Sequence, residues 1–425
     1  MANFYKDNDD LRFYVERGGI DWEPLVRLLE NDFTDPEGFA TSEDAVAFYR
    51  DVFDMFGELV ANEIDPHVAA LEHEEPRLVD GEVVFPAKLD EIFEQLKSLE
   101  LHGLAVPREL GGINGPLLAY MITAEILSRV DVSIMGHYGF HSGIAMALLM
   151  YSVEEGTTQF DPETGKIVST RFSDAIAEIV RGDAWGSMDI TEPDAGSDMG
   201  SLRTKAEQDA DGNWFVTGQK IFITSGHGKY HVVIARTEDE GGLEALSTFV
   251  VPGYEDHEDG TRTRYVTVER LEDKLGHHLS ATCALSFERA PAHLIGARGE
   301  GFKHMLLLMN NARIAVGFEA LGICEAAYRF AVEFAEERKS MGKPIAKHEM
   351  IAEYLDDMEL TIRGLRAMSF EAGYHEEVAS RLKASLKLNP PSSDDEKREI
   401  ERRVRRHKRK ARHFTPLIKY FGGEE

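Results

Sequence analysis

The spacing of apolar side chains changes twice along the chain and predicts three structural regions. From Ser42 onward, apolar residues recur at steps of three and four, as they do on one face of an amphipathic helix. Near Ala184 the pattern changes to short alternating runs separated by turn-rich pieces, which predicts strands. From Gly301 the helical spacing returns. We therefore expect helices, then strands, then helices, and not a doubly wound fold.

The first region divides into several helices. Apolar residues at helical spacing run from Val46 to Val60, and residues 1–40 carry shorter apolar clusters that predict a helical N-terminal extension. Further helices are predicted over 86–101, 117–129 and 139–151. The segment VPRELGGINGP, residues 106–116, separates two of them, because its prolines and glycines interrupt a helix.

The central region is predicted to be an antiparallel β module. Its alternating runs are 214–217, 220–224, 231–236, 247–253 and 283–291. The fold class that we expect is α+β, with an N-terminal helical domain, a central antiparallel β-barrel-like domain and a C-terminal helical bundle. The expected boundaries are 1–40 for the N-terminal extension, 41–182 for the N-terminal helical domain, 183–295 for the β domain and 296–425 for the C-terminal helical domain.

Composition narrows the class of protein. A hydrophobic content of 43% is sufficient for a packed core, and a net charge of −29 disfavours a general nucleic-acid-binding or anionic-membrane surface. Cys283 and Cys324 are the only cysteines of the sequence, so we expect no disulfide framework and a reducing compartment. The first residues contain no apolar signal segment, and the longest apolar stretch, 144–151, is too short to span a membrane. A cytoplasmic location without a membrane partner is therefore expected.

One segment departs from this acidic composition. Residues 397–412 contain ten Lys or Arg against two acids. A solvated helix or helix hairpin, paired with the protein's own acids, is the first interpretation. Phosphate or nucleic-acid binding is the rival, but the run has no interleaved aromatic residues for base stacking, so a nucleic-acid partner is not expected.

Two short segments carry the candidate chemistry. They read TEPDAGSD at 191–198 and GQKIFITSG at 218–226. Hydroxyl side chains, flexible glycines and the apolar residues Phe222 and Ile223 together suit a flat ligand with a polar edge and an apolar face. A capped surface turn is the alternative interpretation of the first segment taken alone.

With both segments in view, the sequence resembles the acyl-CoA dehydrogenase flavoprotein family. GLAVPRELGG at 103–112, KLGHHLSATCALSFERAP at 274–291, GARGEGF at 296–302 and FAEERKSMGKPIAKHE at 334–349 resemble further family segments in the right order. The N-terminal extension and the charged linker near residue 390 resemble the long branch, which includes methylmercaptopropionyl-CoA dehydrogenases. The resemblance implies FAD as cofactor and an acyl-CoA substrate.

It also implies roles for residues around the isoalloxazine. Met188, Ile190 and Thr191 would lie against the ring, with Thr191 bonding its polar edge. Phe222 would pack on the ring where the family usually has Trp, and Thr224 would donate near N5, the atom that receives the hydride.

The remaining roles concern the pyrophosphate and the substrate. Ser197 would lie where the flavin meets the substrate pantetheine, and Arg313 matches a substrate-side arginine, with Asn310 replacing a frequent Asp. Arg338 would reach the FAD pyrophosphate of a neighbouring subunit. His348 would make a further FAD contact, and Glu349 follows it where the family prefers Gln.

The implied reaction is α,β-desaturation of an acyl thioester, which needs a carboxylate base and a flavin as electron sink. No catalytic residue is assigned, because the family's glutamate segment does not occur here and its other position for the base holds Ala312. We expect the base beyond Glu425, in a chain that is incomplete at its C-terminus, binds FAD weakly and does not oxidise acyl-CoA alone. The resemblance also implies a homodimer or homotetramer and an electron-transfer flavoprotein partner. An inactive or regulatory flavin-fold protein and an acyl-CoA oxidase are the alternatives.

Overall fold

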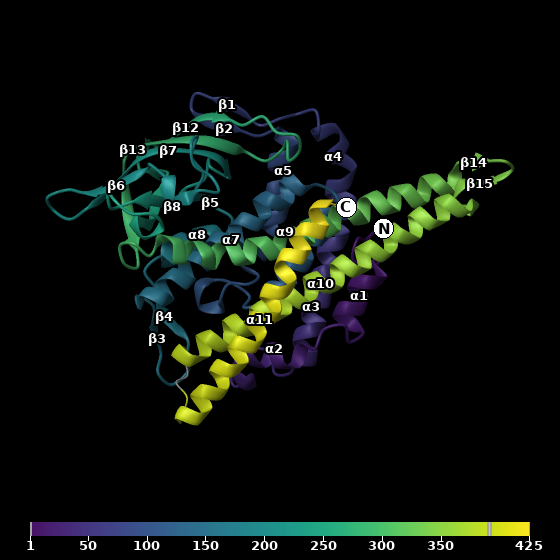
Figure 1. The fold of residues 1–425 in the computed structure, drawn as a ribbon, viewed down its shortest axis with the longest axis horizontal. Coiled ribbons are helices and arrows are strands. Elements are labelled where there is room, and N and C mark those ends of the chain that lie inside the picture. The colour runs from purple at the N-terminus through teal and green to yellow at the C-terminus, as the bar shows by residue number, and fades with distance from the viewer. Residues whose placement is uncertain (1, 389–390, 392, 425) are drawn as a thin grey trace. The chain divides into compact units, whose positions relative to one another are not determined.

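The computed structural model describes residues 2–388, 391 and 393–424 (Figure 1). Its contacts divide the chain into two compact units that do not follow chain order. The helical unit comprises Met1–Val68, Gly115–Met135 and Asn311–Glu425. The sheet unit comprises Ala69–Asn114 and Gly136–Asn310. The expected order of helices, strands and helices is confirmed along the chain, while the predicted domain boundaries stay predictions.

The helical unit is built mainly from long helices. They are α1 (Asp9–Glu16), α2 (Trp22–Leu29), α3 (Ser42–Leu59), α6 (Leu117–Ser128), α9 (Gly301–Glu337), α10 (Glu349–Leu388) and α11 (Asp394–Glu424), with α4 (Asp65–Leu71) and the first turns of α9 continuing into the sheet unit. Side chains cap two N-termini: Asn8 accepts from the amide of Leu11, and Thr41 accepts from the amide of Asp44. The N-terminal extension is therefore helical, as predicted.

The two longest helices form a hairpin. The short strands β14 (Lys339–Ser340) and β15 (Lys343–Pro344) join α9 to α10 at its tip (Figure 1). The third long helix, α11, contains the whole basic run and packs along α10. It also approaches α9 closely, since a Cβ added at Gly317 would clash with Ile418. The basic run is thus helical, and one of its sides is held against the helical unit.

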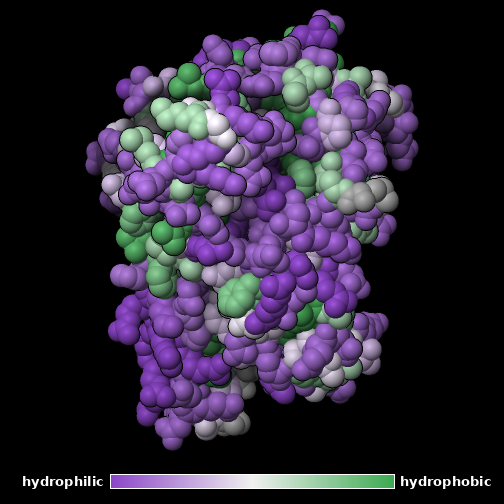
Figure 2. Space-filling model, turned by 90° about the vertical axis from the view of Figure 1, so that its right-hand side faces the viewer, coloured by the Kyte–Doolittle hydropathy of each residue, from purple (hydrophilic) through white to green (hydrophobic). Residues whose placement is uncertain are grey.

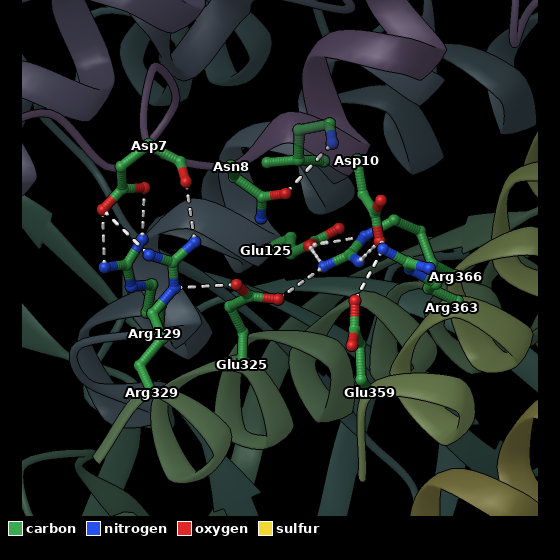
Figure 3. A network of polar contacts seen from close by, with 11 residues as sticks. Asp7, Asn8, Asp10, Glu125, Arg129, Glu325, Arg329, Glu359, Arg363 and Arg366 are labelled. Atoms are coloured by element: carbon green, nitrogen blue, oxygen red, sulfur yellow. Dashed lines mark hydrogen bonds and ion pairs between the residues drawn. The ribbon is translucent and has the colours of Figure 1, made fainter. Parts of the chain in front are cut away.

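A buried network of charges connects the helices of this unit (Figure 3). Arg366 on α10 is 1% exposed and donates to Glu125 of α6 at 2.6 Å, to Glu325 of α9 at 3.0 Å and to Asp10 of α1 at 2.9 Å. Burial opposes the charge on Arg366, but Glu125 and Glu325 outweigh burial and raise its pKa. Four helices therefore share one buried guanidinium.

The sheet unit contains helices α5 (Ala87–Ser98), α7 (Val132–Glu155, with its first turn in the helical unit) and α8 (Ser173–Val180). Its seven-stranded sheet consists of β5 (Gly186–Asp189), β6 (Lys205–Gln208), β7 (Trp214–Thr224), β8 (Tyr230–Arg236), β9 (Leu246–Pro252), β12 (Val266–Leu271) and β13 (Thr282–Ile295). The smaller strands pair as β1 (Arg77–Val79) with β2 (Glu82–Val84), β3 (Gln159–Phe160) with β4 (Ile167–Ser169), and β10 (Tyr254–Asp256) with β11 (Arg262–Arg264).

The strand order is β12-β13-β7-β6-β8-β5, and β9 pairs with both β13 and β8. Two features differ from the prediction. The runs 214–217 and 220–224 belong to the single strand β7, because Gly218, at φ 154°, passes directly against Thr204 without ending the strand. The sheet is mostly antiparallel, but β5 runs parallel to β8 from the pair Gly186–Tyr230 to the pair Asp189–Val233. The module is therefore a mixed sheet.

Packing in the sheet unit explains why α7 and α8 are apolar. Ile144, Leu148, Ile176 and Ile179 form a core with the sheet residue Val232. Burial of side chains of this size stabilises the unit by about 1.5–3 kcal/mol each. α9 alone among the described helices has the length and apolar composition to cross a bilayer, features that the core helix of a helical protein also has.

Candidate functional site

The structure brings the two candidate segments together. Lys220 on β7 extends its ammonium to the loop after β5, where it donates to the carbonyl of Ile190 at 2.9 Å and to the carboxylate of Glu192 at 2.8 Å. It also donates to the carbonyl of Ile234 at 2.8 Å. The amide of Ile221 donates to the carbonyl of Thr191 at 2.9 Å. The positions of Ile190 and Thr191 are therefore set from β7.

Glu192 completes this anchor. Its carboxylate accepts from Lys220 and from the amides of Arg203 at 2.6 Å and Thr204 at 3.0 Å. Burial opposes ionisation, but the Lys220 ammonium and these donors outweigh burial and hold the pKa of Glu192 below its usual value. Burial lowers the pKa of Lys220, and the nearby Glu192 carboxylate counters that effect. Because this carboxylate is fully engaged, it is not available as a general base.

Phe222 faces solvent because the strand is irregular at this point. Ile223 pairs with Cys283 and Lys220 with Leu285, so two residues of β7 stand opposite one residue of β13 in a bulge. Phe222 lies in that bulge at φ 59°, and its side chain is 59% exposed. A bulky residue at positive φ is an outlier that carries strain of about 1–3 kcal/mol. The bulge thus orients an apolar ring outward.

Three hydroxyls on the two candidate segments meet the requirements of a ligand edge. Thr191 and Thr224 are half-buried and Ser197 is exposed, and none of their hydroxyls has a hydrogen-bond partner among the described residues. Met188 and Ile190, also half-buried, supply apolar surface on the same segment. Free donors next to exposed apolar side chains match an isoalloxazine, which has a polar edge and an apolar face. The residues present therefore fit a flavin.

The start of α9 packs next to this segment. Phe302, Leu306 and Met309 on its first turns join Ile190 and Met199 in a hydrophobic cluster. Asn310 and Arg313 follow on the same helix, three residues apart, and both are half-buried. Residues at this spacing lie on one helix face. The predicted substrate pair is therefore adjacent along α9, directly after the turns that contact the loop.

The predicted pyrophosphate residues meet at the tip of the α9–α10 hairpin. Arg338 follows the last residue of α9, and its carbonyl accepts from the amide of Ile345 at 2.8 Å. The ring of His348 hydrogen-bonds the carbonyl of Ser340 at 3.1 Å. The guanidinium of Arg338 is exposed and has no ion pair within the described part of the chain. This cation remains available to an anionic group.

Sequence reasoning missed a second buried polar group beneath the site. Ser187, Asp189 and His231 are 0–1% exposed, with His231 Nδ1 at 2.8 Å from Asp189 and 2.9 Å from the Ser187 hydroxyl. Their types match a hydrolytic triad, but burial keeps substrate away from this serine. Along β5 they alternate with Met188 and so point to the opposite face. The group anchors β5 to β8. No strand was predicted over β5, and hydrophobic spacing does not identify its partner on β8.

Comparison with known protein families covers most of the chain. Family models of the acyl-CoA dehydrogenase N-terminal, middle and C-terminal domains match residues 49–163, 187–290 and 299–386. The chain is 32% identical over 319 residues to an acryloyl-CoA reductase (NADH) of Anaerotignum propionicum, covering 73% of this chain and 74% of that protein.

Two further matches bear on the long branch and the cofactor. A 3-methylmercaptopropionyl-CoA dehydrogenase of Ruegeria pomeroyi is 30% identical over 76% of this chain, which spans 55% of that protein. An acyl-CoA dehydrogenase of Bacillus anthracis, solved in complex with FAD, has a TM-score of 0.66 at 22% identity, covering 92% of this chain and 58% of that one. At this identity, the structural likeness shows a shared fold and no more.

Proposed function

This chain belongs to the acyl-CoA dehydrogenase family, and from that premise we propose how its own residues serve FAD-dependent oxidation of an acyl-CoA thioester. The observation that carries the proposal is the Lys220 anchor. It sets the positions of Ile190 and Thr191 beside β7, the strand that carries the exposed Phe222, and the hydroxyls of Thr191 and Thr224 have no partner in the described chain. FAD supplies the electron sink for α,β-desaturation, which no amino-acid side chain provides.

The side chains divide the binding task between ring and edge. Phe222, Met188 and Ile190 supply apolar contact area, whereas Thr191 and Thr224 offer hydroxyl donors to the edge of the ring system. Because Lys220 and Glu192 hold the segment in place before the ligand binds, little conformational freedom is lost on binding. Preorganised donors are the form of electrostatic assistance that costs no reorganisation during reaction.

On the substrate side, Ser197, Asn310 and Arg313 would contact the acyl-CoA. Arg313 has no ion pair among the described residues, and its planar guanidinium suits an oxygen-rich ligand. Asn310 offers a neutral amide on the same helix face.

A second copy of this chain completes the proposed cofactor site. Arg338 and His348 would serve the FAD pyrophosphate of a partner in a homodimer or homotetramer. Exposed apolar side chains support this role: Phe330, Phe334, Met341, Met350 and Tyr354 are 60–92% exposed along the hairpin. In a space-filling view, hydrophobic atoms reach the surface in patches among mostly hydrophilic ones (Figure 2). Large apolar side chains exposed in this number are typical of an interface.

The electron acceptor that we propose is an electron-transfer flavoprotein, and the location that we propose is the cytoplasm. Neither a nucleic acid nor a membrane is needed for this function. An oxidase would instead let dioxygen reach the reduced flavin, so peroxide release during turnover distinguishes the two acceptors.

Anaerobic addition of an acyl-CoA panel to the FAD-reconstituted protein tests the proposal. Loss of visible flavin absorbance with one acyl-CoA supports a dehydrogenase and identifies the chain length. Stable FAD binding without bleaching by any acyl-CoA, under conditions in which dithionite reduces the flavin, would mean that residues 1–425 lack the base, as expected from the sequence, or that the protein is the inactive flavin-fold alternative. Failure to bind FAD would contradict the proposal.

A further inference from the structure

The pairing of β7 with β13 ends at one of the residues assigned to the flavin. Thr224 is the last residue of β7 and pairs with Thr282, the first residue of β13. The next residues, Ser225 and Ala281, still interact, since the amide of Ser225 donates to the carbonyl of Ala281 at 3.0 Å. The position of Thr224 therefore depends on what holds this end of the strand pair.

Ser225 has an unfavourable backbone conformation and a buried side chain. It lies at φ 55°, a region in which residues other than glycine are uncommon and are held by their surroundings. Its carbonyl accepts from the amide of Gly228 at 2.9 Å. The residue is 0% exposed, and a buried hydroxyl requires a partner within the protein. That partner comes from another element.

His137 on α7 is the partner of this hydroxyl. Its Nδ1 lies 3.1 Å from the Ser225 hydroxyl oxygen, and its Nε2 accepts from the amide of Ala281 at 3.3 Å. Because the amide can only donate, Nδ1 carries the ring proton and donates to Ser225. One imidazole thus contacts both residues of the pair that follows Thr224 and Thr282.

Aromatic side chains fix the orientation of this imidazole. His137 is 0% exposed. Its ring meets Trp185, Phe93 and Phe85 edge to face, with centroids 4.7, 5.2 and 5.4 Å away. Because the ring is packed in this way, it cannot turn away from Ser225 without disturbing the core.

The imidazole is neutral in the folded protein. Burial, above all, lowers the pKa of His137 well below its usual value. The neighbouring His227 and Lys274 add to this shift, and the carbonyl of Leu279 opposes it. A neutral ring offers one donor and one acceptor nitrogen, which matches a hydroxyl on one side and an amide on the other.

We propose that His137 is a positioning residue for the flavin site, which holds the end of the β7–β13 pairing and thereby sets where the Thr224 hydroxyl meets the edge of the ring. The inference rests on the proposed function, in which Thr224 donates to the isoalloxazine. His137 itself is fully buried and lies behind the strand. It acts only through the backbone that carries Thr224.

A double-variant cycle tests whether His137 acts through Thr224. FAD affinity is measured by titration of the apoprotein, followed through the visible flavin spectrum. Thr224→Val should weaken FAD roughly fivefold in the parent, because one donor is lost. His137→Phe keeps a ring in the aromatic cluster and should weaken FAD by about the same factor. Within H137F, the T224V change should add less than about twofold, because the hydroxyl is already displaced.

His141→Phe is the matched control. His141 lies one turn further along α7, is 3% exposed and contacts Trp185 at 4.4 Å. Among the described residues, it has no hydrogen bond to either candidate segment. H141F should therefore disturb the same core, while T224V added to it should still weaken FAD by the full factor of about five.

Hydrogen exchange of the apoprotein detects the clamp without any cofactor. The amide of Ser225 should exchange about tenfold faster or more in H137F, and no such local change should occur in H141F. His137→Asn places a side-chain donor near the position of Nδ1. It should therefore restore slow exchange at Ser225 and bring FAD affinity to within about twofold of the parent.

Three results would overturn the assignment. One is an equal loss of FAD affinity in H137F and H141F. Another is a full effect of T224V within H137F. The third is faster exchange at Ser225 with unaltered FAD affinity, which would reveal a clamp with a structural role alone. If T224V leaves FAD affinity unchanged in the parent, the proposed role of Thr224 fails and this inference fails with it, whereas failure of the inference alone leaves the parent's response to T224V intact.

Discussion

The helical unit and the sheet unit each bury one cation, and the two cations have different neighbours. Arg366 connects four helices through Glu125, Glu325 and Asp10, and its partners have no assigned ligand contact. Lys220 connects β7 to the loop that presents Ile190 and Thr191. A buried ion pair is a structural device in both units, but only the Lys220 pair lies directly behind the surface that we propose for the flavin. Removal of either cation should therefore destabilise its unit, whereas flavin binding should depend specifically on Lys220.

The largest effects are expected from the cations themselves. Lys220→Met leaves the Glu192 carboxylate buried without its counter-charge, and Arg366→Met does the same to Glu125 and Glu325. Each should lower the free energy of unfolding by about 3–5 kcal/mol in chemical denaturation. A loss below about 1 kcal/mol for either variant would mean that its buried carboxylates are protonated or solvated instead.

A compensated double variant separates stability from ligand binding. K220M/E192L replaces the pair with apolar side chains of similar volume, which should recover most of the stability lost in Lys220→Met. FAD affinity should stay at least tenfold below the parent, because the carbonyl of Ile190 and the amides of Arg203 and Thr204 lose their anchor. FAD binding is measured by titration of the apoprotein. Restored affinity together with restored stability would show that the pair has only a structural role.

Unlike loss of the Lys220 cation, loss of the Phe222 ring should weaken FAD binding with little change in the free energy of unfolding. Its side chain is 59% exposed, so Phe222→Ala should change the free energy of unfolding by no more than about 0.5 kcal/mol. Loss of ring contact should weaken FAD roughly fivefold in the same titration. A matched change at the exposed Phe330, Phe330→Ala, should leave FAD binding by the monomer unaltered.

The smallest effect concerns the pH dependence of stability and two histidines of the helical unit. His375 and His407 face each other at 3.0 Å between α10 and α11, among Arg403, Arg406 and Lys410. Burial first lowers both pKa values from 6.5 to about 4; Lys410 and Arg406 add to the shift of His375, and His375 itself, followed by the cations, adds to that of His407. Because the folded pKa lies below the unfolded one, the pair leaves stability intact above pH 6.5, and stability is lost as the pH falls towards 4.

His407→Gln should therefore flatten the pH dependence of unfolding over that window, by on the order of 1 kcal/mol after allowance for the solvent around His407. His413→Gln, an exposed change on the same helix, should keep the parent's slope. An unchanged slope in His407→Gln would contradict the depressed pKa values.

Hydrophobic spacing was sufficient to predict the order of the regions and helices over α3, α5, α6 and part of α7, since three- and four-residue steps run through α3 and the first turns of α9. It predicted no separate helix over α8 or α10. It could not predict the bulge in β7. Strict alternation places Lys220, Phe222 and Thr224 on one face, yet Lys220 is fully buried and Phe222 is largely exposed. The positive φ at Phe222 breaks the alternation, and only the pairing with β13 reveals it.

The two segments of the candidate site were predictable from the sequence, but the buried ion pair that holds them together was not. Thr191 and Thr224 were proposed as flavin contacts from their motifs. Lys220 was given no role, because lysine is rarely buried unless it is paired with a carboxylate. Its partners are Ile190, Glu192 and Ile234, and the last lies on β8, so the anchor depends on strand order. The roles of all the assigned residues stay predictions: Met188, Ile190, Thr191, Ser197, Phe222 and Thr224 as well as Arg338, His348, Asn310 and Arg313.

The central claim is that the hydroxyls of Thr191 and Thr224 face the edge of the isoalloxazine. Titration of the apoprotein with FAD, followed through the visible flavin spectrum, tests it in the T191V/T224V variant, which keeps side-chain volume and removes both donors. We predict that affinity falls about tenfold or more and that the bound spectrum shifts, while the free energy of unfolding changes by less than about 1 kcal/mol. Unaltered affinity and an unaltered spectrum in the folded variant would contradict the account.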